Sequence, residues 1–341
     1  TAWYVVALAL DPENRELYDE ALAQLNEFIE RGVFDEDPAA GRALTAHARR
    51  LLTERATRFP SSPAPVSLAQ IEFLAAMVEL HSGHPDGARQ HFLASLEAGP
   101  LNEVLREFGT FETRLGNAEP AAELLRRALD RTLGESLEVN VQRAGLLQEL
   151  GNAFHVAGNE AQAQRMYRQA LDLYDAALPQ LSEQGVGFVQ SRRGVLLDTL
   201  GSREQARIAF LAAVEASPLE REIYMVPMMH LTTATPDLPL MRELYRRALL
   251  NLGLAPEWKV YFALWTQFVA LRAGEPAGEE VDAVLERFAR HTPWYGRLAA
   301  FGAGTLDGPG LVAAATTAGQ RAEAHFYVAV RQTAAGDTGA A

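Results

Sequence analysis

The chain has 341 residues, of which 48% are hydrophobic, and its formal net charge is −13. A chain of this size buries a sizeable apolar core, while its acidity argues against the basic surface with which proteins follow nucleic-acid phosphates. It contains no cysteine, which excludes disulfides and thiolate metal sites. Lys259 is the only lysine among 31 basic residues, and we expect such usage from a GC-rich bacterial genome.

Residues 1–60 are expected to form degenerate amino-terminal repeats. The apolar run Trp3–Leu10 is too short to cross a bilayer, so we expect no membrane insertion. The default location is cytoplasmic, and the alternative is periplasmic if a signal peptide has been removed. Tyr4, Ala7 and Pro12 have the spacing of the second helix of a pair whose first helix is missing. Two more helices are expected between residues 14 and 60, joined by a long loop at residues 32–41.

A pattern of small and large residues recurs along residues 61–291, the expected main array. After a turn glycine comes a small residue, then a large one four positions later, then a second small one after three more. These sets are Ala88, Phe92 and Ser95; Ala121, Leu125 and Ala128; Ala163, Tyr167 and Ala170; Ala206, Phe210 and Ala213; and, more weakly, Met241, Tyr245 and Ala248. On the preceding helices Gly109, Gly151 and Gly194 fall where two helix backbones must approach closely.

This pattern resembles the tetratricopeptide repeat (TPR). The resemblance implies an all-α fold, a right-handed superhelical solenoid of stacked antiparallel helix pairs. It also implies a protein–protein interaction scaffold that binds a peptide or a partner protein in its concave groove, without catalysis. The alternative is a regulatory or sensor arm of a larger enzyme, such as a protease, kinase or transferase, since both ends of the chain have the form of interrupted repeats. The identity of the partner stays open.

Residues 292–341 are expected to form an irregular carboxy-terminal repeat region. Glycines between residues 302 and 310 lie close together and predict short helices. Trp294 and Tyr295 stand beside a proline, and we expect them to be exposed and available to a partner. The aromatic stripe between Trp258 and Phe268 is expected to be mostly core, because a helix in a solenoid is buried on several faces.

No constellation of residues indicates catalysis. The glycine-rich segment 301–310 lacks the preceding strand and the lysine of a phosphate-binding loop, so it predicts a turn. His81, His84 and His91 could meet around zinc, yet no carboxylate or cysteine completes the set at a metal-motif spacing. We therefore expect solvated turn histidines, no bound metal, no cofactor and no enzymatic activity.

The candidate binding residues follow from the resemblance. In TPR proteins the groove is lined by first-helix positions that the packing pattern does not use. Carried over to this chain, they are Arg106, Thr110, Arg114, Gln148, Asn152, His155, Ser191, Arg192 and Asp198. Arg106, Asn152 and Arg192 resemble part of the clamp that some TPR co-chaperones use for a peptide carboxylate, whereas Gln148 and Phe188 stand where that clamp has lysines. Guanidinium groups suit such capture, and the alternative is that these arginines pair with neighbouring carboxylates on solvated helix faces.

Overall fold

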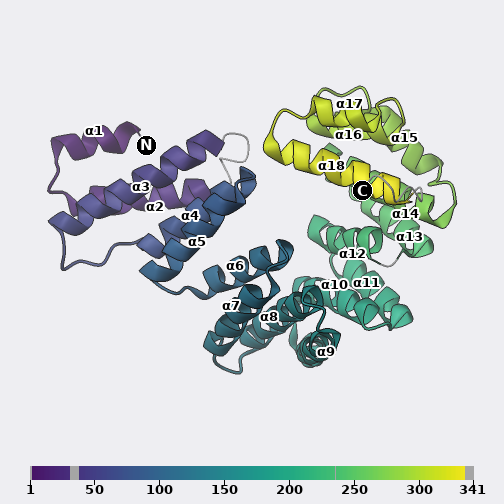
Figure 1. The fold of residues 1–341 in the computed structure, drawn as a ribbon, viewed down its shortest axis with the longest axis horizontal. Helices are drawn as coiled ribbons and strands as arrows, with labels where there is room; N and C mark the ends of the chain where they lie inside the picture. Colours follow the sequence, from purple (N-terminus) through teal and green to yellow (C-terminus); the bar gives the residue numbers. More distant parts are fainter. Residues whose placement is uncertain (1, 31–37, 235, 335–341) are drawn as a thin grey trace. The chain divides into compact units, whose positions relative to one another are not determined.

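The computed structural model describes residues 2–30, 38–234 and 236–334, and within these ranges every regular element is a helix (Figure 1). No strand occurs among them, so the predicted all-α class is confirmed. The helices are α1 (Ala2–Leu10), α2 (Arg15–Glu30), α3 (Pro38–Arg58), α4 (Leu68–His81), α5 (Pro85–Ala98), α6 (Asn102–Arg114), α7 (Ala118–Arg131), α8 (Leu137–Val156), α9 (Glu160–Ala177), η1 (Leu178–Gln180), α10 (Glu183–Thr199), α11 (Arg203–Ala216), α12 (Arg221–Thr233), α13 (Leu238–Leu249), α14 (Pro256–Ala273), α15 (Glu279–Phe288), α16 (Trp294–Gly302), α17 (Gly308–Ala314) and α18 (Ala318–Ala334).

The chain forms two compact units. The first comprises residues 1–132 and 152–158, and the second comprises residues 133–151 and 159–341. Consecutive helices pack as antiparallel pairs, α4 with α5 and α6 with α7 in the first unit, and α10 with α11 in the second (Figure 1). The predicted division of the array at residues 60 and 291 stays a prediction.

The alternation of small and large residues in the sequence determines how the two helices of each pair pack against each other. The large members Phe92, Leu125, Tyr167 and Phe210 expose at most 3% of their surface. Each of the later three faces a glycine of the preceding helix: a Cβ on Gly109 would lie 2.7 Å from Leu125, one on Gly151 2.4 Å from Tyr167, and one on Gly194 2.5 Å from Phe210. Because real Cβ atoms essentially never approach this closely, a larger residue at these positions would force its neighbour to shift, and the repeat pattern is confirmed.

The turns between paired helices also depend on glycine. Gly158 and Gly201 have φ angles of 72° and 85°, a left-handed conformation that costs other residues energy. This geometry ends one helix and starts the next within three residues. It explains why a turn glycine marks these pairs in the sequence.

The amino-terminal region is tied together by one buried arginine. Arg55 of α3 is 1% exposed, and it donates to Oδ1 of Asp19 on α2 and to the carbonyl oxygens of Ser62 and Pro63, at 2.8 and 2.9 Å. The proline-rich connection after α3 is therefore held against the helices. The loop expected at residues 32–41 is shorter than predicted at its far end, since α3 begins at Pro38, and residues 31–37 lie outside the described residues.

The carboxy-terminal region contains the predicted short helices, α16 and α17. The aromatic stripe of α14 is mostly core, as expected, with Phe262, Trp265 and Phe268 at most 2% exposed. Trp294 is different from the prediction: it is half-buried, and its Nε1 donates to Oε2 of Glu323 on α18 at 2.6 Å. The indole is covered by a helix that follows it by almost thirty residues in the chain.

Candidate functional site

Two of the predicted binding residues are polar side chains that the fold buries without satisfying them. Gln148 of α8 is 6% exposed and Ser191 of α10 is 2% exposed. Within the part of the chain that the structure describes, Oε1 of Gln148 and Oγ of Ser191 have no hydrogen-bond partner, and neither has Oε1 of Gln190. Buried polar atoms in folded proteins are almost always paired, so these three atoms are exceptions within the second unit.

Arg192 lies beside these atoms on α10. Its Nη1 is 3.8 Å from Oε1 of Glu149 on α8, an ion pair longer than a hydrogen bond, and its buried Nε has no partner among the described residues. The guanidinium also lies over the ring of Phe188, 5.4 Å from the centroid, and this ring is 46% exposed. A cation stacked on an exposed aromatic ring gains modest stabilisation.

Tyr174 of α9 interacts electrostatically with Arg192 and Glu149. It is 1% exposed, and burial raises the pKa of its phenol to about 12, with Arg192 lowering it and Glu149 raising it. The phenol is therefore neutral at physiological pH. Tyr174, Phe188 and Gln190 stand outside the predicted set, and of these only Phe188 occupied a position that the sequence had marked.

Asp198, the last predicted residue on α10, is already paired within the chain. Its side chain is 7% exposed, and Oδ2 lies 2.8 Å from Nε2 of His230 on α12. This contact joins the first helices of two successive pairs. Asp198 therefore has a structural partner, and a ligand would meet the pair rather than a free carboxylate.

The other predicted residues belong to the first unit. Arg106 of α6 is exposed and donates to Oε1 of its neighbour Glu107 at 2.8 Å, which is the solvated pairing that the sequence left open. Arg114 is exposed and makes no hydrogen bond or ion pair with any described residue. Thr110 and Asn152 are half-buried, and His155 is exposed near the end of α8. The predicted nine residues thus divide between the two units, with Gln148, Ser191, Arg192 and Asp198 in the second.

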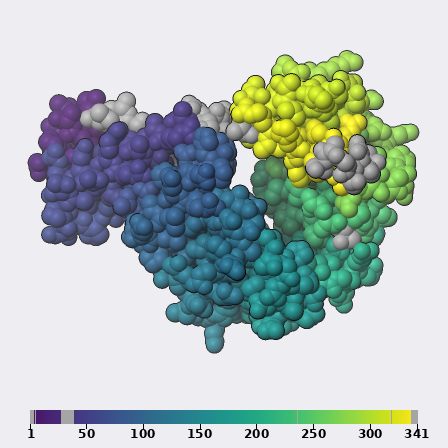
Figure 2. Space-filling model, in the orientation of Figure 1, coloured from purple at the N-terminus to yellow at the C-terminus, as the bar shows by residue number. Residues whose placement is uncertain are grey.

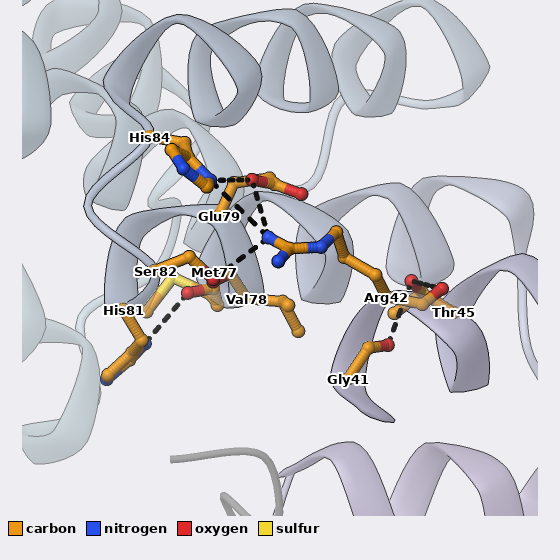
Figure 3. A network of polar contacts seen from close by, with 9 residues as sticks. All are labelled: Gly41, Arg42, Thr45, Met77, Val78, Glu79, His81, Ser82 and His84. Carbon is orange, nitrogen blue, oxygen red and sulfur yellow. Dashed lines mark hydrogen bonds and ion pairs between the residues drawn. The ribbon is translucent and has the colours of Figure 1, made fainter. Parts of the chain in front are cut away.

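Two histidines of the predicted cluster, His81 and His84, are held by protein partners (Figure 3). Nδ1 of His81 lies 2.7 Å from the carbonyl oxygen of Met77, and Nδ1 of His84 lies 3.0 Å from Oε2 of Glu79. Glu79 is also 3.4 Å from Nη1 of Arg42 on α3. His84 therefore belongs to a bridge between helices, in which the carboxylate of α4 is shared by an arginine and an imidazole.

A second bridge repeats this arrangement along the same helices. Glu72 of α4 is 6% exposed, and it lies 2.6 Å from Nε of Arg49 on α3 and 2.7 Å from Nδ1 of His91 on α5. Each member is seven residues, about two helical turns, from its counterpart in the first bridge. Among the described residues no group of three or more His, Asp or Glu side chains is arranged to hold a metal ion.

A further polar group lies at the other end of the second unit. The carboxylate of Glu323 on α18 accepts from Nε1 of Trp294 and from the hydroxyl of Tyr261. Burial raises the pKa of Glu323 above its ordinary value, and the two hydrogen bonds lower it by less. The glycine-rich segment nearby serves as a helix start: Oδ1 of Asp307 accepts from the amide of Gly310 at 2.8 Å.

This raised pKa predicts a pH-dependent effect of Glu323→Gln. An acid whose pKa is raised by folding binds more protons in the folded state, so its contribution to stability is lost as the pH rises from about 4.3, the unfolded pKa, through the folded pKa. Replacing it with the neutral amide should therefore raise the melting temperature at pH 7 and change it little at pH 4. Thermal unfolding of both proteins at pH 4, 5.5 and 7 measures this difference.

Glu279→Gln is the matched control, because Glu279 is an exposed carboxylate on α15 without an ion-pair partner among the described residues. Its effect should be small and should not grow with pH. A Glu323→Gln protein that is less stable than the parent at pH 7 would show that the charged hydrogen bonds outweigh the cost of burial.

No helix in the described part of the chain combines the length and apolar character that a membrane span requires.

No protein-family model and no curated protein sequence matches the chain. Among solved structures it is similar to PilF of Pseudomonas aeruginosa, with 18% identity, coverage of 73% of this chain and 98% of that one, and a TM-score of 0.42. It is similar to YrrB, described as a TPR protein with an unusual peptide-binding site, with 17% identity, coverage of 66% and 97%, and a TM-score of 0.37. Human IFIT1, solved as a dimer with PPP-AAAA, shares 15% identity, with coverage of 98% and 68% and a TM-score of 0.46.

Proposed function

We propose that this chain, whose helix pairs resemble tetratricopeptide repeats, is a protein-interaction scaffold that holds a peptide or a partner protein on the inner faces of its first helices and performs no catalysis. The observation that supports this proposal most is the unsatisfied polar group of α8 and α10. Gln148, Ser191 and Arg192 keep buried hydrogen-bonding atoms without partners among the described residues. A bound chain would supply the missing partners once the side chains that cover these buried atoms move aside.

The chemistry of these atoms suits an extended peptide. Oε1 of Gln148 is an acceptor for a backbone N–H, whereas Nε of Arg192 is a donor for a backbone carbonyl or a carboxylate. Ser191 has a hydroxyl that either donates or accepts. Phe188 adds an exposed aromatic surface beside them, and aromatic and arginine side chains are the residues that most often dominate binding energy.

The first unit contributes its own polar face to the proposal. Arg114 is exposed and unpaired among the described residues, and Arg106 is engaged only by the adjacent Glu107. An exposed ion pair of this kind is weak, so Arg106 can leave Glu107 and bind a carboxylate of a partner instead. The net charge of −13 argues against a nucleic acid as that partner.

The test is a triple substitution of Arg106, Asn152 and Arg192 to Ala. All three side chains are exposed or half-buried, so folding should be nearly intact while capture of the partner falls by tenfold or more, the equivalent of about 1.4 kcal/mol. The measurement is a pull-down from lysate of the source cells with the full chain as bait. A parallel sample treated with nuclease identifies any capture that depends on nucleic acid.

A matched control carries Arg127→Ala, Arg165→Ala and Gln205→Ala, which alter exposed residues of the second helices α7, α9 and α11. The control should capture the partner as the parent does. Equal capture by the parent and by the folded triple variant would place the binding surface elsewhere. Capture abolished by nuclease would replace the peptide with a nucleic acid.

A further inference from the structure

Two connections between helix pairs lie side by side in the second unit and expose leucines. They are residues 217–220, between α11 and α12, and residues 250–255, between α13 and α14. These four helices pack against one another and are drawn in teal to green in Figures 1 and 2. Leu219 is 72% exposed, Leu250 78% and Leu252 93%. Single exposed leucines are ordinary, but a contiguous apolar patch marks an interaction surface.

The exposure of these leucines is fixed by hydrogen bonds within the two connections. Nδ2 of Asn251 donates to the carbonyl oxygen of Leu219 at 3.0 Å, and Oδ1 of Asn251 accepts from the amide of Gly253 at 3.0 Å. Leu254, in the second connection, is 6% exposed and packs into the core of the unit. A turn that is bonded in this way and anchored by one leucine keeps the remaining leucines in solvent.

A hollow of about 300 Å³ lies beside the exposed leucines, which is about ten water molecules by volume and enough for a leucine side chain. Its apolar walls are Val214, Pro218, Leu219, Tyr224 and Leu250. Leu252 does not line the hollow and stands out from the surface next to it. The three exposed leucines and the hollow are called the leucine patch below. The patch therefore has both a protruding apolar side chain and a space that can receive one.

Two opposite charges flank the hollow, Glu215 of α11 and Arg247 of α13. Glu215 is exposed and makes no ion pair with any described residue. Arg247 donates through Nε to Oε1 of Glu243 at 2.8 Å, and its guanidinium makes no other hydrogen bond with a described residue. Its side chain is 38% exposed. A surface with one charge of each sign beside an apolar centre is complementary to a copy of itself.

We propose that the leucine patch is the contact between two copies of this chain that are related by a two-fold axis. In such a contact the same surface is used by both copies, so every contact occurs twice. Leu252 of each copy enters the hollow of the other, and Glu215 of each copy faces Arg247 of the other. Burial of the leucines provides affinity, and the charges set the orientation. The contact shares no residue with the polar face of α8 and α10, and it does not depend on the function proposed for that face.

Sedimentation velocity of the full chain, from low micromolar concentration upward, tests the proposal. The mean mass should rise with concentration toward that of two chains. Leu252→Gln should raise the dissociation constant by about tenfold or more, because an amide without a partner enters the apolar hollow twice in each dimer. Leu271→Gln is the matched control, since Leu271 is an exposed leucine of α14 about 22 Å from the first residue of that helix. It should associate as the parent does.

Two charge reversals test the two-fold arrangement itself. Glu215→Arg and Arg247→Glu each place like charges opposite one another, so either variant alone should associate about tenfold or more weakly than the parent. In a mixture of the two variants, one copy has both positive charges and the other has both negative charges. Attraction is then restored, and mixed dimers should form with nearly the affinity of the parent. A fluorophore on one of the variants identifies the mixed dimer during sedimentation.

Circular dichroism measures whether each variant keeps the helices of the parent. A parent that stays monomeric at every concentration would assign the leucine patch to a different protein and overturn the proposal. A Leu252→Gln protein that associates as the parent does would also overturn it, and so would a mixture of the charge reversals that associates no better than its components. The Arg106, Asn152 and Arg192 triple variant should associate as the parent does, which separates this surface from the one proposed above.

Discussion

Gly151→Ala is expected to destabilise the second unit by about 2 kcal/mol. The new Cβ would lie 2.4 Å from Cε1 and 2.6 Å from Cδ1 of Tyr167, and the ring has no room to retreat because it is 3% exposed. Overpacking of this kind lowers the free energy of unfolding by about 1–3 kcal/mol or more, and the better helix propensity of alanine offsets about 1 kcal/mol of that loss. Thermal unfolding followed by circular dichroism measures the difference.

Gly145→Ala is the matched control on the same helix. A Cβ there would meet only the hydroxyl of Tyr174, at an ordinary 3.8 Å, so the gain in helix propensity should stabilise the protein by up to about 1 kcal/mol. The two substitutions are chemically identical and should act in opposite directions. Equal effects would show that α8 and α9 do not approach each other as described.

Arg55→Met is expected to cost the first unit about 3 kcal/mol. Methionine replaces the apolar stem of the arginine, but the carbonyl oxygens of Ser62 and Pro63 and the carboxylate of Asp19 lose their donors. Removing one partner of a buried charged pair typically costs about 3–5 kcal/mol, and partial exposure of Asp19 places this case at the lower end. Hydrogen exchange of α2 and α3, with mass-spectrometric detection, measures the loss locally.

Arg58→Met on the same helix should change stability by less than about 0.5 kcal/mol. Arg58 pairs with Glu13, and both side chains are largely in solvent, with relative exposures of 38% and 76%. Exchange rates in α2 and α3 that rise equally in both variants would mean that the buried bonds of Arg55 contribute no more than a surface pair.

The helix pairs could be predicted from the sequence because packing fixes residue size at fixed positions. Gly194 must be small since Phe210 fills the space in front of it, and the same requirement recurs at Gly109 with Leu125 and at Gly151 with Tyr167. Because the small and large residues recur at the same spacing within each helix, the sequence alone is enough to predict which residues meet between the paired helices. The same reasoning placed Gln148 and Ser191 on first helices, where the structure has them.

The polar partners could not be predicted in the same way. Whether Asp198 is free or bonded to His230 depends on side-chain rotamers across two helices that are separated by 32 residues. Trp294 was expected to be exposed because it follows a proline in a glycine-rich region, but α18 covers it. The all-apolar α14 indicated that some cover exists, and nothing in the local sequence of α18 marks it as that cover.

The two bridges of α3, α4 and α5 have a consequence for how these helices are aligned. Apolar side chains tolerate small axial displacements, since one aliphatic contact replaces another at similar energy. Arg42 and Arg49 meet Glu79 and Glu72 at 3.4 and 2.6 Å, and a shift of α3 by one residue along α4 would break both contacts at once. The two carboxylates therefore contribute little to stability, but they fix the axial register of the three helices, because only one longitudinal position satisfies both bridges.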